Sequence, residues 1–237
     1  FFERPFVNMA GAAMDLESLR LLVDRMLAVH RPRVVLLGLD FWWLTAGAPA
    51  GRPERIVQPS LLDASTLRAP WRWLVQGRIA PADMLAPLQH RLRADRYGLE
   101  AQLRDTGYGP DGSLYEGAVL DGRRPAPDHA FARTLRELES GSGVWAGSLA
   151  PDRERLEAFA EICCRLRSRG IRTIVFLPPL ATPVLGALAD RNGGDAGWLS
   201  ALRQGLLDCG VESMDFSDPR VYGSGDCEMM DGLHGGD

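Results

Sequence analysis

The C-terminal segment contains a carboxylate and an imidazole at a spacing that suits acid–base chemistry. Asp231 precedes His234 by three residues, and Gly232 lies in the loop between them. At this spacing the carboxylate can accept the Nδ1–H of the imidazole, which fixes the tautomer and leaves Nε2 to take a proton from a nucleophile. General-base assistance of this kind accelerates a reaction by about 10²–10⁴-fold. We therefore treat Asp231 and His234 as candidate catalytic residues.

Two other interpretations of this segment stay open. Asp-x-x-His occurs by chance in many chains, and an exposed histidine in a polar loop is more often inert. A metal site is the second alternative, because oxygen and nitrogen ligands are concentrated in one short stretch, at Asp226, Glu228, Asp231, His234 and Asp237. The sequence has no second histidine cluster and no H-x-x-x-H pair to support it, so we expect neither a metal nor another cofactor.

The elements that must position these residues follow one pattern three times, in which an amphipathic helix ends at a break and a short apolar run follows. The three pairs are a helix capped by Asp15 with a strand at 34–37, a helix from Pro151 with a strand at 171–177, and a helix at 198–206 with a strand at 211–216. The run 5–9 is expected to form one more strand, leading into Gly11. Parallel strands joined by right-handed helical crossovers form a doubly wound sheet.

We therefore predict an α/β fold with a three-layer, doubly wound parallel sheet. Such sheets bind ligands beyond the C-terminal ends of their strands. The segments that follow the three strands are 38–43, Pro178-Pro179 and 226–237, and we expect them to converge at one edge of the sheet.

Residues 45–149 interrupt the alternation of helices and strands. The stretch is rich in Pro, Gly and Arg, with a helix expected from Pro81 to about Asp105 and turns at Asp111-Gly112 and Asp121-Gly122. We take residues 1–237 as a single domain truncated at both ends, with 45–149 as a long insertion or lid after the Val34 strand. Long excursions in compact domains are usually functional or disordered.

Composition removes several classes of function. The net charge of −4 gives no reason to expect nucleic-acid binding. All 27 basic residues are Arg, and the absence of Lys excludes P-loop nucleotide binding, Schiff-base chemistry and anchoring of pyridoxal phosphate within these residues. Cys163 and Cys164 are adjacent and fit no metal or redox spacing, so we expect them to be packing residues. No apolar stretch reaches 18 residues.

Three segments together resemble the conserved blocks of the SGNH (GDSL-like) hydrolase and acyltransferase superfamily. Val7-Asn8-Met9-Ala10-Gly11 resembles the second block, Gly38-Leu39-Asp40 the third and Asp231-Gly232-Leu233-His234 the last. The long excursion after the third block is closest in style to DltD-like and polysaccharide O-acyltransferase members. The resemblance implies a flavodoxin-like sheet of the SGNH type.

The resemblance also implies roles for single residues. Gly11 would donate its backbone amide to an oxyanion, Gly38 and Asp40 would belong to the oxyanion and substrate-binding region, Asp231 would orient the imidazole, and His234 would be the base. The nucleophilic serine belongs ahead of the second block and is therefore expected upstream of Phe1. Asp40 stands where an asparagine is expected, and an ionised carboxylate repels an oxyanion and donates a hydrogen bond only when protonated.

The function that the resemblance implies is a serine-dependent ester hydrolase or O-acyltransferase, acting on carbohydrate or cell-envelope esters through an acyl-enzyme. A membrane acyl-donor protein is a possible partner, and an extracytoplasmic or membrane-anchored location is implied by the resemblance alone. The alternative is a catalytically lapsed binding or scaffolding domain on the same fold, with Asp40 marking the lost oxyanion hole.

The remaining chemistry-bearing residues have simpler interpretations. Phe41-Trp42-Trp43 could form an aromatic wall for a ligand, but we favour packing into the core. Ser60, Ser65 and Ser113 do not follow a strand and open a helix, as an internal nucleophile would require. Structural or solvated roles are favoured for His30, His90 and His129 and for the arginines at 91, 93, 96 and 104.

Overall fold

The computed structural model describes residues 7–9, 13, 15–46, 64–77, 79–85, 106–109, 114–120, 122, 128–191, 197–229 and 231–234. The chain divides into two compact units. One comprises residues 1–12 and 53–125, and the other comprises residues 13–52 and 126–237. The second unit holds the candidate acid–base residues.

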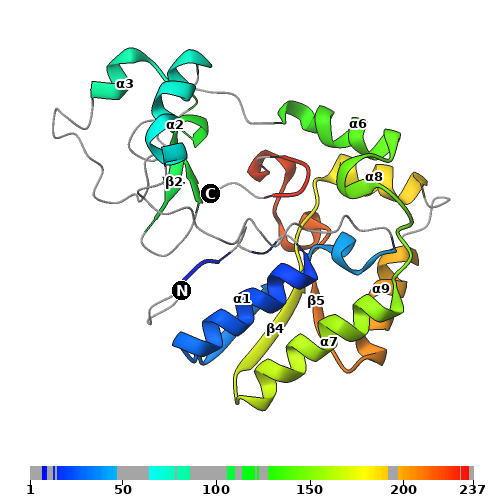
Figure 1. The fold of residues 1–237 in the computed structure, drawn as a ribbon. Coiled ribbons are helices and arrows are strands. Elements are labelled where there is room, and N and C mark those ends of the chain that lie inside the picture. The colour runs from blue at the N-terminus through cyan, green and yellow to red at the C-terminus, as the bar shows by residue number, and fades with distance from the viewer. Residues whose placement is uncertain are drawn as a thin grey trace. The chain divides into compact units, whose positions relative to one another are not determined.

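The centre of the second unit is a parallel sheet of three strands in the order β1-β4-β5 (Figure 1). The strands are β1 (Val34–Gly38), β4 (Arg172–Leu177) and β5 (Ser213–Asp215). Val34 pairs with Arg172 in the first ladder, and Val175 pairs with Ser213 in the second. The structure is thus a mixed helix and strand fold with a three-strand parallel sheet, compatible with the predicted α/β class.

The predicted helix–strand pairs are confirmed, because local signals define their ends. Helix α1 (Leu16–Val29) begins with a capping box, in which the Ser18 amide donates to Asp15 Oδ1 at 2.7 Å and the Asp15 amide donates to Ser18 Oγ at 3.0 Å. Helix α7 (Arg153–Ser168) is capped by Asp152, and Gly170 follows it at φ +70°. Helix α9 (Gly197–Asp208) ends before Gly210 at φ +72°.

The helices pack on the sheet through the core. Helix α7 contacts α1, α9 and β4, and Figure 1 shows α1 and α7 beside that strand. Side chains alternate along the strands: Leu37, Val175 and Leu177 are buried, whereas Val34 and Leu36 are 45% and 42% exposed. The prediction of three layers, with helices on both faces of the sheet, is therefore not shown within the described residues.

Two helices of the second unit were not predicted. Helix α6 (Ala132–Ser140) lies within the stretch taken as an insertion, and α8 (Thr182–Arg191) follows Pro178-Pro179, which we expected at the edge of the sheet without a helix after it. The two pack against each other. The first residue of the stretch 45–149 lies beside the chain just after its end, since Thr45 forms an isolated antiparallel bridge with Pro151.

The aromatic run after β1 belongs to the core, as we favoured. Residues Phe41–Leu44 form the 3-10 helix η1, and Phe41, Trp42 and Trp43 are only 5%, 8% and 6% exposed. The Phe41 ring lies 4.8 Å from that of Trp198 and 5.6 Å from that of Trp145, between ring centroids. Cys163 is 2% exposed, which confirms a packing role, although its neighbour Cys164 is exposed.

The first unit contains short elements. They are α2 (Ala64–Val75), α3 (Pro81–Leu85), α5 (Gly117–Leu120) and an antiparallel pair of β2 (Thr106–Tyr108) with β3 (Leu114–Glu116). The helix predicted from Pro81 is described only to Leu85. Residues 7–9 of the expected N-terminal strand are in no strand, and Val7 is 67% exposed, so the apolar run there did not by itself make a buried strand.

Short helices complete the described chain. Four are 3-10 helices of the second unit, at His129–Phe131, Gly143–Trp145, Pro219–Tyr222 and Asp226–Glu228. Among the residues that the structure describes, no helix is both long and apolar enough to cross a membrane.

Candidate functional site

The segment after β5 returns to the end of β4 and is held there by three hydrogen bonds. The Leu180 amide donates to the Ser217 carbonyl at 2.9 Å, and the Ala181 amide donates to the Gly232 carbonyl at 3.1 Å. The Asp226 carboxylate accepts from the Thr182 amide at 2.7 Å, which caps the first turn of α8. The C-terminal loop is therefore fixed at the C-terminal edge of the sheet.

Gly232 allows the loop to approach two helices closely. A Cβ atom at this position would lie 2.7 Å from Thr134 Cγ2 on α6 and 2.7 Å from Val184 Cγ2 on α8. Both distances are shorter than side-chain carbons tolerate, so a residue with a side chain would push the loop away. The glycine that we noted between Asp231 and His234 has a packing reason to be there.

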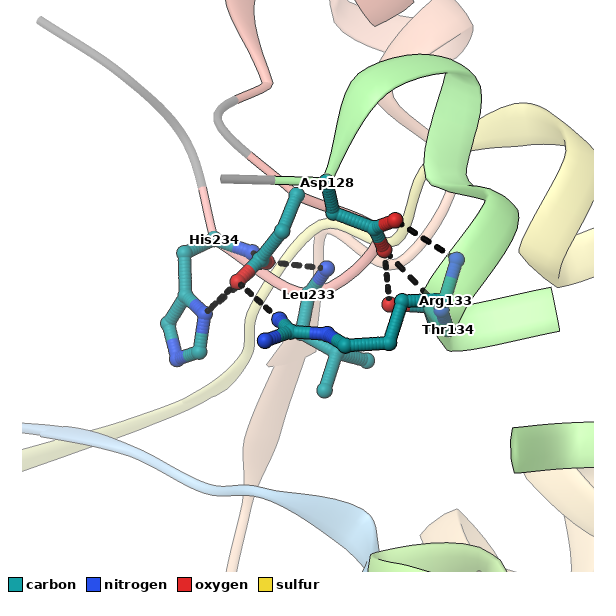
Figure 2. Close-up of polar contacts among 6 residues, drawn as sticks. Asp128, Arg133, Thr134, Leu233 and His234 are labelled. Atoms are coloured by element: carbon teal, nitrogen blue, oxygen red, sulfur yellow. Dashed lines mark hydrogen bonds and ion pairs between the residues drawn. The ribbon is translucent and has the colours of Figure 1, made fainter. Parts of the chain in front are cut away.

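The structure brings Asp231 and His234 into direct contact (Figure 2). His234 Nδ1 lies 3.0 Å from Asp231 Oδ1 and 3.2 Å from Oδ2. The same Oδ1 also accepts from the backbone amides of Leu233 and His234, both at 2.9 Å. Because these amides hold the carboxylate in a tight turn, the imidazole is presented with Nε2 directed away from Asp231.

The pair favours an ionised carboxylate and a basic imidazole. Burial alone would raise the pKa of Asp231, but hydrogen bonds from His234 and Leu233 outweigh it and lower that pKa below the ordinary value. The hydrogen bond to Asp231 raises the pKa of His234 against the effect of its partial burial. The Asp231 side chain is 17% exposed and that of His234 is 66% exposed, so the base remains accessible.

Asp40 follows β1 and lies within electrostatic reach of His234. Burial raises the pKa of Asp40 to about 6, and the charge of His234 lowers it in part. The negative charge of Asp40 in turn raises the pKa of His234. The Asp40 side chain makes no capping hydrogen bond to η1. The end of β1 and the C-terminal loop thus converge, as the strand topology predicts.

A small, mostly apolar pocket opens at this convergence. It has room for about one water molecule. Its walls come from the segments that follow all three strands and from α9, and include Asp40, Trp42, Pro178, Trp198, Ser217 and Leu233. The Ser217 hydroxyl is not available as a nucleophile there, because Ser217 is 4% exposed and donates to Asp215 Oδ1 at 2.6 Å.

The two glycines expected near an oxyanion are Gly38 and Gly11. Gly38 lies in β1 opposite Phe176, and a Cβ at Gly38 would lie 3.1 Å from the Phe176 ring. The following amide, of Leu39, is bound to the Phe176 carbonyl at 2.8 Å. Gly38 therefore has a packing role, and its part in binding an oxyanion stays a prediction. Gly11 lies outside the described residues.

Sequence reasoning missed a second group of polar residues beside the pair, on α6. Arg133 Nη2 lies 3.8 Å from Asp231 Oδ2. The buried carboxylate of Asp128 holds the start of this helix through the Arg133 and Thr134 amides. The only sequence signal was a polar residue ahead of a helix start, within a stretch that we had assigned to the insertion.

The structure gives no support to the metal alternative. Among the described residues, no group of three or more His, Cys, Asp or Glu side chains is placed to hold a metal ion. Asp226 is instead used at the start of α8, and Glu228 accepts a hydrogen bond from Ser224. Asp237 lies outside the part of the chain that the structure describes.

His234 has no serine partner within the described residues. Its side chain is hydrogen-bonded to Asp231 alone among these residues, and its Nε2 makes no hydrogen bond to that part of the chain. Ser60 and Ser113 lie outside the described residues, and the Ser65 side chain is not described. Comparisons of this chain with protein-family models, with curated proteins and with solved structures find no match.

Proposed function

We propose that this chain supplies the acid–base half of a serine-dependent ester hydrolase or O-acyltransferase. The observation that carries the proposal is the contact of His234 Nδ1 with an ionised Asp231, at the edge of a parallel sheet where such folds bind ligands. An imidazole held in this way is suited to accept a proton at Nε2 and to return it.

In the first half of the reaction, His234 Nε2 accepts the proton of a serine hydroxyl while the serine oxygen attacks the carbonyl carbon of an ester. The bond between that carbon and the leaving oxygen then breaks, and the Nε2 proton passes to the leaving alcohol. In the second half, water or a sugar hydroxyl gives its proton to Nε2 and attacks the acyl-enzyme, and the proton returns to the serine. Following the SGNH resemblance, the serine comes from the segment ahead of Phe1.

The proposed substrates are carbohydrate or cell-envelope esters, a class taken from the resemblance. A membrane acyl-donor protein would fit the transferase version of this proposal. The pocket beside Asp40 and Leu233 has room for about one water molecule between apolar walls, so it cannot hold a long acyl chain as it stands. An acetyl ester suits these dimensions better than a long-chain ester.

One observation favours the alternative of a lapsed binding or scaffolding domain. The pKa of Asp40 is about 6, so the carboxyl is mostly ionised at neutral pH. A negative charge there opposes the oxyanion that the reaction develops. A protonated Asp40 would instead donate a hydrogen bond, so the proposed enzyme would gain stabilisation of the oxyanion below about pH 6.

The test is hydrolysis of a small aryl acetate by the intact protein that carries this chain. We expect His234→Ala to lower kcat by about 10²–10⁴-fold while the folded structure is retained. His30→Ala is the matched control, because His30 is exposed at the end of α1, remote from the site in sequence and structure, and should leave the rate unchanged. Equal rates for the wild-type protein and His234→Ala would refute the acid–base role. A folded wild-type protein without any esterase or transferase activity would favour the lapsed domain.

A further inference from the structure

A guanidinium lies next to the carboxylate that orients His234. Arg133 Nη2 is 3.8 Å from Asp231 Oδ2, the oxygen that also lies 3.2 Å from His234 Nδ1. Figure 2 shows the guanidinium and the imidazole reaching the same carboxyl group. The guanidinium of Arg133 and the imidazole of His234 therefore share one carboxylate. Removing the charge of Arg133 should change the protonation of His234.

The backbone of Arg133 is held in place by hydrogen bonds at the start of α6. Asp128 is 4% exposed, and its Oδ1 accepts from the Arg133 amide at 2.7 Å. Its Oδ2 accepts from the Thr134 amide at 2.9 Å and from the Thr134 hydroxyl at 2.6 Å. Ala130 and Phe131, which lead into α6, have positive φ values of 52° and 58°. The carboxylate of Asp128 thus fixes a turn that these two residues disfavour.

The loop that carries Asp231 is fixed against the same turn of α6. Gly232 packs so closely on Thr134 that a Cβ would lie 2.7 Å from its methyl carbon. Thr134 therefore contacts Asp128, which lies just ahead of the 3-10 helix His129–Phe131, and also packs against Gly232 of the C-terminal loop. This double contact sets the separation between the backbone of Arg133 and the carboxylate of Asp231.

Three charged groups from different parts of the fold affect the protonation of His234. Asp231 belongs to the same loop, Asp40 to the end of β1 and Arg133 to α6. The two carboxylates favour the protonated imidazole, whereas the guanidinium disfavours it. Arg133 is the only positive charge among these groups in the described part of the chain, and its side chain is 55% exposed.

We propose that Arg133 is a positioning residue of the Asp231–His234 pair, whose guanidinium lies beside Asp231 Oδ2 and competes with the imidazole for that carboxylate. This role rests on the proposed function, because it matters for catalysis only if His234 is the base. The interaction itself is a property of the folded chain and can be measured without any reaction.

The test is the titration of the His234 ring followed by NMR, in the whole chain. The signal is assigned by its loss in His234→Gln, which separates it from His30, His90 and His129. We expect Arg133→Gln to shift the midpoint of the His234 titration to higher pH, because a positive charge is removed. We expect Arg133→Lys, which keeps a charge, to titrate closer to the wild-type protein. Arg136→Gln is the matched control, since it removes an exposed arginine of the same helix that has no contact with Asp231 or His234 in the structure.

The proposal is overturned if Arg133→Gln leaves the His234 midpoint where it is, or if Arg136→Gln moves it equally. Circular dichroism verifies that each variant is folded. If the intact protein hydrolyses esters, the acidic limb of its profile of kcat/KM against pH should move to higher pH in Arg133→Gln, together with the midpoint of the His234 titration. A shifted midpoint without any hydrolysis in the wild-type protein would contradict the proposed function and leave the Arg133 interaction standing.

Discussion

The carboxyl group of Asp40 and the imidazole of His234 influence each other's protonation across the C-terminal edge of the sheet. Asp40 follows β1, and His234 lies in the loop after the last strand. Their interaction joins two segments that are far apart in the sequence. It also places an anion beside the proposed base, where the SGNH resemblance implies an uncharged amide.

Replacing Asp40 with asparagine should stabilise the protein at alkaline pH. The folded-state pKa of about 6 lies above the ordinary value of 3.8 for an aspartate, so between these two pH values the folded protein retains a proton that the unfolded chain has lost. Stability therefore falls as pH rises from about 4 to about 6 and stays reduced above that range. Asp40→Asn removes this loss, which gives a gain on the order of 1–3 kcal/mol at pH 8.

Urea unfolding followed by tryptophan fluorescence measures this gain. The difference between Asp40→Asn and the wild-type protein should be large at pH 8 and small at pH 4, where Asp40 is protonated in the folded state. Asp208→Asn, at an exposed position on α9, is the control for the loss of a carboxylate. A gain of the same size at both pH values would mean that burial of the Asp40 charge is not its cause.

Substitution of Gly232 should destabilise the protein through steric overlap. The new Cβ of Gly232→Ala would meet Thr134 and Val184, each at 2.7 Å. Forcing an extra carbon into a packed site costs about 1–3 kcal/mol. Gly186→Ala in α8 is the control, because nothing lies within 4 Å of its Cβ position and alanine stabilises a helix interior by roughly 0.5–1 kcal/mol. Thermal unfolding of the two variants should move in opposite directions, and a neutral Gly232→Ala would show that the loop is not clamped there.

Removal of the Asp231 charge should make His234 a weaker base. Asp231→Asn loses the hydrogen bond and the charge that raise the pKa of His234, so the NMR titration of this ring should move to lower pH. The lowered pKa of Asp231 stabilises the folded protein above about pH 4. The raised pKa of His234 stabilises it fully below about pH 6.5, and this contribution is lost as the pH rises through the pKa of His234 in the folded protein.

The destabilisation by Asp231→Asn should thus be largest between these two limits. Unfolding measured at pH 3, 5.5 and 9 tests this window, with Asp208→Asn as the control. An unchanged titration of His234 in Asp231→Asn would contradict the hydrogen-bonded pair shown in Figure 2.

The sequence predicted those parts of the molecule whose signals are local. Asp15 caps α1 through a residue three positions away, and Gly170 ends α7 by its own backbone conformation. The contact between Asp231 and His234 is also local, since a three-residue turn is enough to form it. In each case the partners lie within one short segment, so spacing and residue type were sufficient.

Other parts could not be predicted because their partners are distant in the chain. The start of α8 is capped by Asp226, which lies 44 residues beyond Thr182. The ion pair of Arg133 with Asp231 depends on how α6 packs against the C-terminal loop. The strand predicted at 5–9 shows the opposite failure, because its described residues, 7–9, are in no strand.

The rate at which a fluorophosphonate reagent modifies a serine of the intact protein tests the acid–base role of His234 most directly, since this step needs only the nucleophile and its base. Intact mass spectrometry over time gives that rate, and peptide mapping identifies the serine. We expect a single modified serine in the wild-type protein and modification at least about 10²-fold slower in His234→Ala. Modification at equal rates in the two proteins, or no modification of the folded wild-type protein, would contradict the account.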